Sequence, residues 1–290
     1  MIVGREGRRR LTPRRSSFRT IALLTLLPVL GLLALLVWSF VSLNVRFPLP
    51  AKRKTKQVTT AQIVPPAPPR QRGKIVLILD DVGFDKQPIA EATRIDPNLN
   101  FSVLPNAPHA VEFATLLHRQ GFEVLCHLPM EPEQYPRVSP GSGAVLTSMT
   151  DEQIVRTTLS NVERVPYARG VNNHMGSRAT ADRRVMNAVL SALPEDMYFI
   201  DSRTTPASVA ATVAHEMSIR AATRNVFLDD IETDDAVRRQ LRDLARESEE
   251  RGVAIGIGHM YPVTIRVLSA EIPELRRQGF KLIRASQGVR

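Results

Sequence analysis

The sequence predicts an α/β fold built on parallel strands, and three observations support this prediction. Short apolar runs alternate with helix-length amphipathic segments through most of the chain after residue 72. The first of these runs, KIVLIL at 74–79, has no alternating polar residue, as expected of a strand buried on both faces. Polar, chemically capable residues follow several of the runs, and parallel strands bind ligands at their carboxyl ends.

The predicted elements follow the alternation along the chain. Strands are expected at 74–79, 100–104, 123–127, 170–173, 198–200, 225–228, 253–258 and 281–284. Helices are expected at 87–94, 108–119, 150–163, 180–191, 205–215, 233–250 and 263–277. The polar and apolar spacing is most clearly helical within 182–190 and 235–250. Seven or eight strands in a chain of this length suit a barrel or a doubly wound sheet, and periodicity alone does not choose between them.

Composition and charge exclude several classes of protein. The 290 residues carry a formal charge of +10, but residues 1–72 hold 14 Lys and Arg against one acidic residue. Residues 73–290 hold 25 basic and 28 acidic side chains, so the folded part is slightly acidic and a basic nucleic-acid-binding domain is not expected. The single cysteine, Cys126, excludes an intramolecular disulfide and a cysteine-rich zinc module.

The N-terminal quarter predicts a membrane anchor and a linker. Residues 21–41 carry no charge and would span about 30 Å as a helix, the thickness of a bilayer core. Seven arginines in the tail 1–20 predict that this tail is cytoplasmic, which places the rest of the chain outside the inner membrane, in the periplasm or an equivalent compartment. A cleaved signal peptide is the alternative, but the apolar run is long and its end makes a poor cleavage site. Residues 42–72, rich in Pro and Lys, predict a semi-extended spacer before the domain at 73–290.

Asp80 and Asp81 follow the first buried strand directly. Their side chains can serve different roles, one binding a metal ion while the other accepts a proton from water. A helix N-cap beside the turn glycine Gly83 is the alternative. Two adjacent carboxylates need a counter-charge at close range, which favours a functional site.

Imidazoles and amides follow three further strands. His127 lies four residues before Glu131, and Pro129 between them favours a tight turn over a helix. Asn172, Asn173 and His174 lie at the end of the next predicted strand, and His259 follows a glycine-loosened strand at 253–258. Imidazole is a common zinc ligand, and a histidine can also exchange protons near neutral pH. Each of these histidines has the alternative interpretation of a hydrogen-bonded core residue.

Three further carboxylates follow later strands, and two interpretations are open for them. They are Asp201, after the strand at 198–200, and the pair Asp229 and Asp230, after the strand at 225–228. Each could support a histidine, or could cap a helix and form ion pairs.

Cys126 precedes His127, and the alternation of side chains along the strand points its thiol away from His127 and into the packed core.

The motifs occur in a specific order. They are KIVLILDDVGF at 74–84, FSVLPN at 101–106, EVLCHLPMEP at 123–132, NNHMGS at 172–177, FIDSRT at 199–204 and GIGHMYP at 256–262. This ordered set resembles the divergent polysaccharide deacetylase family, over roughly 74–286. The resemblance implies a distorted (β/α) barrel of seven or so parallel strands, with a metal site at the carboxyl ends of the strands.

The resemblance also implies roles for individual residues. Asp80 would be the general base, Asp81 a metal ligand together with His127, and His259 the general acid. Glu131 stands where the better-known deacetylases have a second histidine, and His174 is expected to supply the missing imidazole. Glu131, Asn172, Asn173, Asp201 and Asp230 are expected to bind substrate or to support the ligands.

The implied activity is hydrolysis of acetyl groups on a glycan or a peptidoglycan-like polymer, with Zn²⁺ or another divalent metal as cofactor. Two alternatives remain at this stage. One is a catalytically silent glycan-binding module on the same fold, which the Glu131 departure favours. The other is a scaffold for envelope assembly.

Overall fold

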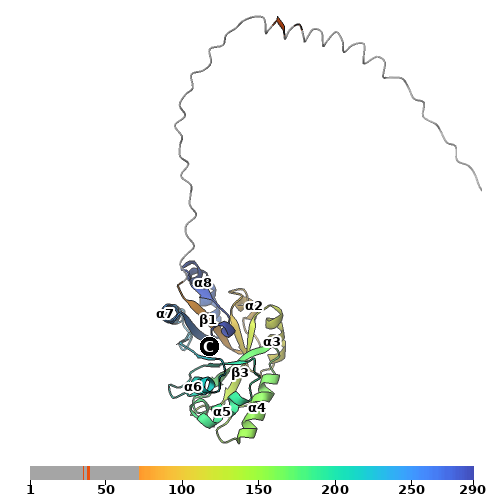
Figure 1. Cartoon of the computed structure of the whole chain (residues 1–290), viewed down its shortest axis with the longest axis vertical. Helices are drawn as coiled ribbons and strands as arrows, with labels where there is room; N and C mark the ends of the chain where they lie inside the picture. The colour runs from red at the N-terminus through yellow and green to blue at the C-terminus, as the bar shows by residue number, and fades with distance from the viewer. Residues whose placement is uncertain (1–34, 36–37, 40–71) are drawn as a thin grey trace, which may run out of the picture. The chain divides into compact units, whose positions relative to one another are not determined.

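The computed structural model describes Leu35, Trp38, Ser39 and residues 72–290 (Figure 1). The tail at 1–20, most of the predicted span at 21–41 and nearly all of the linker at 42–72 lie outside the described residues. Among the residues that are described, no helix combines the length and the apolar character needed to cross a membrane.

The described domain consists of strands that alternate with helices, as predicted. The strands are β1 (Lys74–Val82), β2 (Asn100–Val103), β3 (Glu123–Met130), β4 (Ala168–Met175), β5 (Tyr198–Asp201), β6 (Ala221–Thr223), β7 (Val226–Phe227), β8 (Val253–His259) and β9 (Lys281–Leu282). The α-helices are α2 (Ile89–Ala92), α3 (Ala110–Arg119), α4 (Asp151–Glu163), α5 (Arg183–Ser191), α6 (Ala210–Glu216), α7 (Asp234–Arg251) and α8 (Pro262–Arg277). Two short 3₁₀ helices lie at Ala179–Ala181 and Ala285–Gln287.

All strand pairs of the described domain are parallel, which confirms the predicted α/β class. The order across the sheet is β6-β5-β4-β3-β2-β1-β8-β7, and β9 pairs with the first residues of β1. The two outer strands of this order, β6 and β7, are joined directly by Arg224 and Asn225. The sheet is therefore curled into a distorted barrel whose gap is crossed by two residues of the chain.

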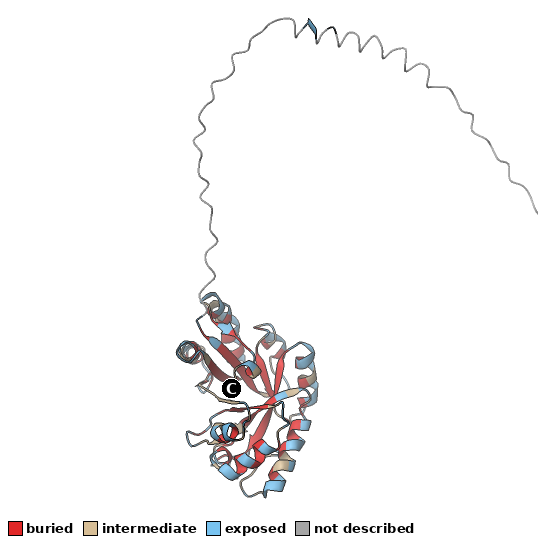
Figure 2. Cartoon of the chain, viewed as in Figure 1, coloured by how far each residue is buried: buried red, intermediate tan, exposed pale blue. Residues whose placement is uncertain are grey.

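Two apolar cores result from this curl. The larger core lies between the outward faces of the strands and the surrounding helices, and it includes Leu77, Leu79 and Phe101. The smaller core fills the inside of the curled sheet with Val76, Ile78 and other apolar side chains. Figure 2 shows the buried strands at the centre and the exposed helix faces at the periphery.

The N-terminal end of the curled sheet is closed by the last residues of the chain. Asn100 and Glu123 point inward there, and each accepts a backbone hydrogen bond from the Ala285–Gln287 turn, at 2.8 Å from Ala285 and 2.6 Å from Ser286. Tyr198 donates its hydroxyl to Glu123 at 2.7 Å. Because this end is sealed by polar contacts, the open end of the curled sheet is the one formed by the carboxyl ends of the strands.

Local signals explain several helix boundaries. Thr150 and Gln153 form a reciprocal capping box at the start of α4, and Asp182 caps α5. Gly252, at φ 79°, ends α7, where an L-residue would be strained.

Three local predictions were wrong in detail. The helix expected at 87–94 is only one turn long, α2, and β6 was not expected because its residues Ala221, Ala222 and Thr223 form no apolar run. The tight turn expected at Pro129 does not form, because β3 continues through Pro129 to Met130. Pro129 has no N–H to contribute, but its carbonyl accepts a hydrogen bond from Val145 at 2.9 Å.

Gly170 is required by the packing of the inner core. A Cβ atom added at Gly170 would lie 2.4 Å from the ring of Tyr198, which the Glu123 hydrogen bond holds in place. We expect Gly170→Ala to lower the free energy of unfolding by about 1–3 kcal/mol, as overpacking does in other cores. Arg169→Ala, an exposed change on the same strand, should cost less than about 0.5 kcal/mol. Denaturant unfolding measures both, and equal stabilities would contradict this packing.

Candidate metal centre

Four strands bring their polar residues together at the open end of the curled sheet. β1 lies beside β8, and Asp80 is the register partner of His259. β3 lies beside β4, where His127 pairs with Asn172 and Pro129 pairs with His174. Side chains that are far apart in the sequence therefore share one end of the sheet, as the parallel topology predicts.

The backbone at Asp81 breaks the regular alternation of β1. Asp81 has φ 58°, in the left-handed region that non-glycine residues seldom adopt. The pairing of β1 with β2 shifts register between Leu79 and Val82, as at a β-bulge. In a regular strand, Asp80 and Asp81 would point to opposite faces. Here both carboxylates reach the same imidazole nitrogen, His127 Nε2, which is 3.5 Å from Asp80 Oδ2 and 3.3 Å from Asp81 Oδ1.

Asp81, His127 and His174 form a compact group of potential metal ligands. Asp81 Oδ1 is 3.0 Å from His174 Nδ1 and 3.3 Å from His127 Nε2, and the two imidazole nitrogens are 3.3 Å apart. Among the described residues, this is the set of His, Cys, Asp and Glu whose ligand atoms lie close enough together to hold a metal ion.

The donor atoms of this group fit a divalent cation. Asp81 Oδ1 is a buried oxygen that makes no hydrogen bond of regular geometry and is contacted by the imidazole nitrogens of His174 and His127, at 3.0 and 3.3 Å. A carboxylate oxygen and two imidazole nitrogens that converge on one point suit a cation in the space between them. Two imidazoles with one carboxylate are a donor set of catalytic zinc, and one coordination position is then left open.

Asn172 fixes the orientation of His127. An ionised carboxylate can only accept hydrogen bonds, so Asn172 turns its amide nitrogen toward Asp80, at 2.9 and 3.1 Å from the two oxygens. Its carbonyl oxygen therefore faces His127 and accepts the proton of Nδ1 at 2.9 Å. His127 Nε2 is consequently the nitrogen that is left to bind a cation. Metal-binding histidines are commonly held in this way through the second ring nitrogen.

Asp80 is almost completely enclosed by the protein. Its residue is 3% exposed, and its two oxygens accept from Asn172. Burial raises the pKa of Asp80, and the nearby His127, His259 and Asn172 offset only part of that effect. A buried carboxylate with a raised pKa is a better proton acceptor than an exposed one when it is ionised.

Asp81 and His127 form a strongly coupled ion pair. Burial alone would raise the pKa of Asp81, but the imidazoles of His127 and His174 lower it far below its usual value. Burial alone would also lower the pKa of His127, but Asp80 and Asp81 raise it to about 9. Without a cation, His127 therefore carries the positive charge that balances the aspartates.

His259 faces Oδ2 of Asp81, whereas His127 and His174 face Oδ1. Its Nδ1 is 3.0 Å from Asp229 Oδ1, and its backbone N–H donates to Asp229 Oδ2 at 2.6 Å. Thr264 also donates to that oxygen, at 2.7 Å. His259 Nε2 then faces Asp81 Oδ2 at 3.7 Å. Burial opposes protonation, but Asp229 outweighs it and raises the pKa of His259.

Glu131 does not join the ligand group. One of its oxygens pairs with Arg178 at 2.7 Å, and the other accepts from the backbone and hydroxyl of Thr147 at 2.5 and 2.7 Å. Both oxygens are thus occupied by protein donors. His174, from the neighbouring strand, stands beside Asp81 and His127 instead.

The remaining predicted residues have separate contacts. Asn173 accepts from the backbone N–H of Ser202 at 2.8 Å and donates to the Met175 carbonyl at 2.7 Å. Asp201 accepts from the Arg203 backbone and from the Ser208 hydroxyl, each at 2.8 Å, and no histidine contact is found for it in the described domain. The exposed Asp230 lines a different pocket, so Asp229 is the member of that pair that supports His259.

Two hydroxyl residues of the site were not predicted. Ser102 donates to the carbonyl of Asn172, and Ser202 accepts from the Asn172 amide at 3.2 Å. The sequence did hold a signal for Ser102, because Asn100 and Ser102 alternate with the apolar Phe101 and Val103 along β2. This alternation marks a polar interior at one face of an otherwise buried strand.

Comparisons with known proteins agree with this architecture. A family model described as divergent polysaccharide deacetylase matches residues 77–289. The uncharacterized protein YibQ of Escherichia coli is 36% identical over 207 residues, which are 70% of this chain and 63% of that protein. The match therefore spans less than two thirds of the length of the E. coli protein.

Two further relatives extend the comparison. An uncharacterized protein of Haemophilus influenzae is 34% identical over 205 residues, 70% of this chain and 72% of that protein. The crystal structure of an uncharacterized protein from Agrobacterium tumefaciens superimposes with a TM-score of 0.71 at 21% identity, over 75% of this chain and 89% of that chain. This structure supports the fold.

Asp81 is the residue whose loss should empty the site. We expect Asp81→Ala to reduce bound metal in the purified full-length chain from one ion to near zero, because the carboxylate supplies the charge that balances a divalent cation. The control Asp230→Ala removes an exposed aspartate outside the group and should keep its metal. Elemental analysis of both variants measures this, and full metal content in Asp81→Ala would exclude the assignment.

Metal binding should release a proton. His127 is protonated in the metal-free protein below its pKa of about 9, and it must be neutral to bind a cation. Apparent metal affinity should therefore rise as the pH increases toward about 9. Calorimetric titration of the metal at pH 7 in two buffers of different ionisation enthalpy counts the released protons. A heat that does not depend on the buffer would contradict this protonation state.

Proposed function

The chain belongs to the divergent polysaccharide deacetylase family, and from this premise we propose that it hydrolyses acetyl groups on a glycan in a metal-dependent reaction. The observation that supports the proposal is that Asp80 contacts His127, and His259 contacts Asp81, within the Asp81, His127 and His174 group. A proton acceptor, a set of metal ligands and a proton donor thus meet at one end of the sheet.

Asp81, His127 and His174 are the residues that would hold the cation, which we propose to be Zn²⁺. When bound, the cation would polarise the acetyl carbonyl and make water more acidic at neutral pH. Asn172 would keep His127 in the orientation that presents Nε2, since its carbonyl holds Nδ1 at 2.9 Å.

Asp80 is the proposed general base. Its oxygens lie on the side of His127 that also faces the ligand group, and Asn172 restrains them with two hydrogen bonds. In this position Asp80 would accept a proton from the attacking water. The charge of a bound cation would favour the ionised form of Asp80, which the base needs, over the neutral form that burial favours.

His259 is the proposed general acid. Asp229 holds its Nδ1 and raises its pKa, so the imidazole can carry a proton on Nε2 at neutral pH. That nitrogen faces the site, where it would protonate the departing amine or alkoxide of the sugar. Asp80 and His259 belong to adjacent strands in register, so one face of the sheet provides both proton transfers.

The contacts of Glu131 favour hydrolysis over a silent glycan-binding module. In the sequence, Glu131 stands where a second histidine is expected, which is a reason to doubt metal binding. In the structure, Glu131 forms an ion pair with Arg178 and accepts a hydrogen bond from Thr147. His174 instead places the second imidazole beside Asp81. The silent module and an envelope scaffold remain as outcomes that an activity assay would distinguish.

We also propose that the domain acts on the outer side of the cytoplasmic membrane. The apolar segment 21–41 would anchor the chain, and the arginine-rich tail 1–20 would stay in the cytoplasm. The segment 42–72 would then act as a spacer that lets the domain reach an acetylated polymer such as peptidoglycan.

The roles of Asp80 and His259 can be tested by acetate release. We expect Asp80→Asn and His259→Ala each to lower the rate about 10²–10⁴-fold on acetylated glycan, while bound metal stays near one per chain. Asp230→Asn and His118→Ala, which change residues outside the site, should keep the rate of the unmodified chain. Metal-loaded protein that binds glycan but releases no acetate would instead identify a silent binding module.

A further inference from the structure

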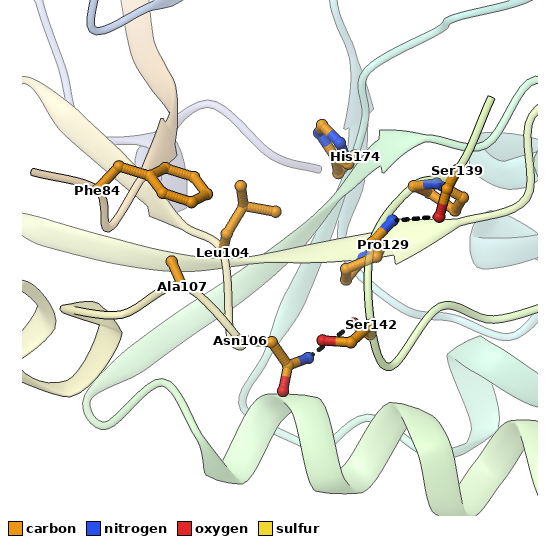
Figure 3. A pocket seen from close by; sticks show the side chains of 10 residues that line it. Phe84, Leu104, Asn106, Ala107, Pro129, Ser139, Ser142 and His174 are labelled. Carbon is orange, nitrogen blue, oxygen red and sulfur yellow. Dashed lines mark hydrogen bonds between the residues drawn. The ribbon is translucent and has the colours of Figure 1, made fainter.

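The two ends of the curled sheet differ in their side chains. The open end holds the candidate metal centre, and His174 lines a pocket of about 250 Å³ there (Figure 3). The opposite end is formed by the first residues of the strands and by the turn at Ala285–Gln287. The chain also enters the domain at this opposite end, because β1 begins there. We call this end the entry face and define it by four exposed cations, Lys74, Arg119, Lys281 and Arg284.

Two lysines stand side by side on the entry face. Lys74 is the first residue of β1 and Lys281 is the first residue of β9, and the two are register partners in the sheet. Both are exposed, and neither forms an ion pair within the described domain. Like charges on directly opposed residues of neighbouring strands are destabilising. The stability of the fold therefore does not explain this pair, whereas an anionic partner outside the domain does.

Two arginines extend the positive charge toward β3. Arg284 donates to the backbone carbonyl of Gly121 at 2.8 Å, which places its guanidinium at the turn between α3 and β3. Arg119 is the last residue of α3, just before this turn, and it is exposed. Neither arginine is paired with a carboxylate of the residues that the structure describes. The nearby Glu123 is buried and accepts from Tyr198 and Ser286 instead.

The acidic side chains around the start of β1 are already balanced. They form ion pairs with other arginines, namely Glu249 with Arg72, Glu274 with Arg277, and the buried Asp96 with Arg276. Each of these pairs cancels its own charge. The four cations that define the entry face therefore leave an excess of positive charge there, although the domain as a whole is slightly acidic.

The entry point of the chain is fixed to this face by backbone hydrogen bonds. Arg72 donates to the Gly279 carbonyl at 3.1 Å, and Lys281 donates to the Gly73 carbonyl at 3.0 Å. The guanidinium of Arg72 also lies over the ring of Phe280, 4.7 Å from its centroid. The linker at 42–72 therefore joins the domain beside the excess of positive charge. With the anchor proposed above at 21–41, this is the face from which the chain runs toward the bilayer.

We propose that the entry face docks on anionic lipid head groups and thereby turns the metal centre away from the bilayer. Basic side chains near an anionic membrane surface are attracted over about one Debye length, roughly 8–10 Å. Docking by the strand starts leaves the carboxyl ends of the strands facing the polymer outside the membrane. This inference rests on the proposed membrane anchoring and is independent of the proposed acetyl hydrolysis.

Energy transfer from the domain to labelled lipids tests the proposal. The full-length chain is reconstituted in vesicles of phosphatidylcholine, with or without phosphatidylglycerol, that carry an acceptor dye on their head groups. The donor dye is attached at Gln120→Cys, beside Gly121 on the entry face, or at Val138→Cys, next to the pocket residue Ser139. Cys126 is buried, and burial raises the pKa of its thiol, so the dye reacts at the introduced cysteine. Transfer should be stronger from position 120 than from position 138 only in vesicles with phosphatidylglycerol, and high salt should remove the difference.

Charge changes at the two lysines identify the docking residues. Donor lifetimes give the ratio of docked to undocked chains, and Lys74→Gln with Lys281→Gln should lower this ratio about tenfold or more. The reversal Lys74→Glu with Lys281→Glu should lower it further. Lys86→Glu is the matched control, because it reverses the only other lysine after residue 72, which is exposed in the loop after β1 at the open end. This control should keep the ratio within about twofold.

The outcomes separate docking from the proposals on which the domain's function rests. Equal transfer from positions 120 and 138 in phosphatidylglycerol vesicles overturns the docking face, and so does docking of the Lys74 and Lys281 variants that equals docking of Lys86→Glu. A difference between the positions that persists in phosphatidylcholine alone also overturns it, because the linker would then set the orientation. A chain that docks but leaves the vesicles at high salt supports the entry face and overturns the anchor. Docking by a chain that releases no acetate supports the entry face and leaves only the deacetylase proposal contradicted.

Discussion

Two adjacent carboxylates can act at one site only if the strand that carries them breaks its alternation. In β1 the break is the left-handed backbone of Asp81, together with the register shift between Leu79 and Val82. Such a conformation is costly for a non-glycine residue and persists only where its surroundings require it. The cost is offset here by the ion pairs of Asp81 with His127 and His174. His127, His174 and His259 all face this carboxylate.

Besides the break in β1, the site requires a polar interior at the open end of an otherwise apolar curled sheet. Asn172 satisfies it with one amide, whose nitrogen serves Asp80 and whose oxygen serves His127. A buried polar network is favourable only when all its members are paired, and in the metal-free protein Asp81 Oδ1 is paired by the imidazoles of His127 and His174. The convergence of this oxygen and two imidazole nitrogens is the feature that a bound cation would explain.

Much of the fold could be predicted from the sequence, because buried parallel strands leave continuous apolar runs such as 74–79 and polar residues at their ends. The same rule indicated Asp80, Asp81, His127, His174 and His259 as residues of one face. It could not show that Asp229 rather than Asp230 faces His259, because neighbouring residues at a strand end differ only in direction. It also missed β6, whose small residues form no apolar run, and the continuation of β3 through Pro129. Partners such as Ser102 depend on packing between strands that are distant in the sequence.

The central claim is that Asp81, His127 and His174 hold one divalent cation, with Asp80 and His259 beside this group. Anomalous diffraction from crystals of the full-length chain grown with Zn²⁺ tests it most directly, because the signal locates the metal without assumptions about its ligands. We predict a single strong peak at bonding distance from Asp81 Oδ1, His127 Nε2 and His174 Nδ1. A peak at other residues, or no peak in crystals whose protein still releases acetate, would contradict the account.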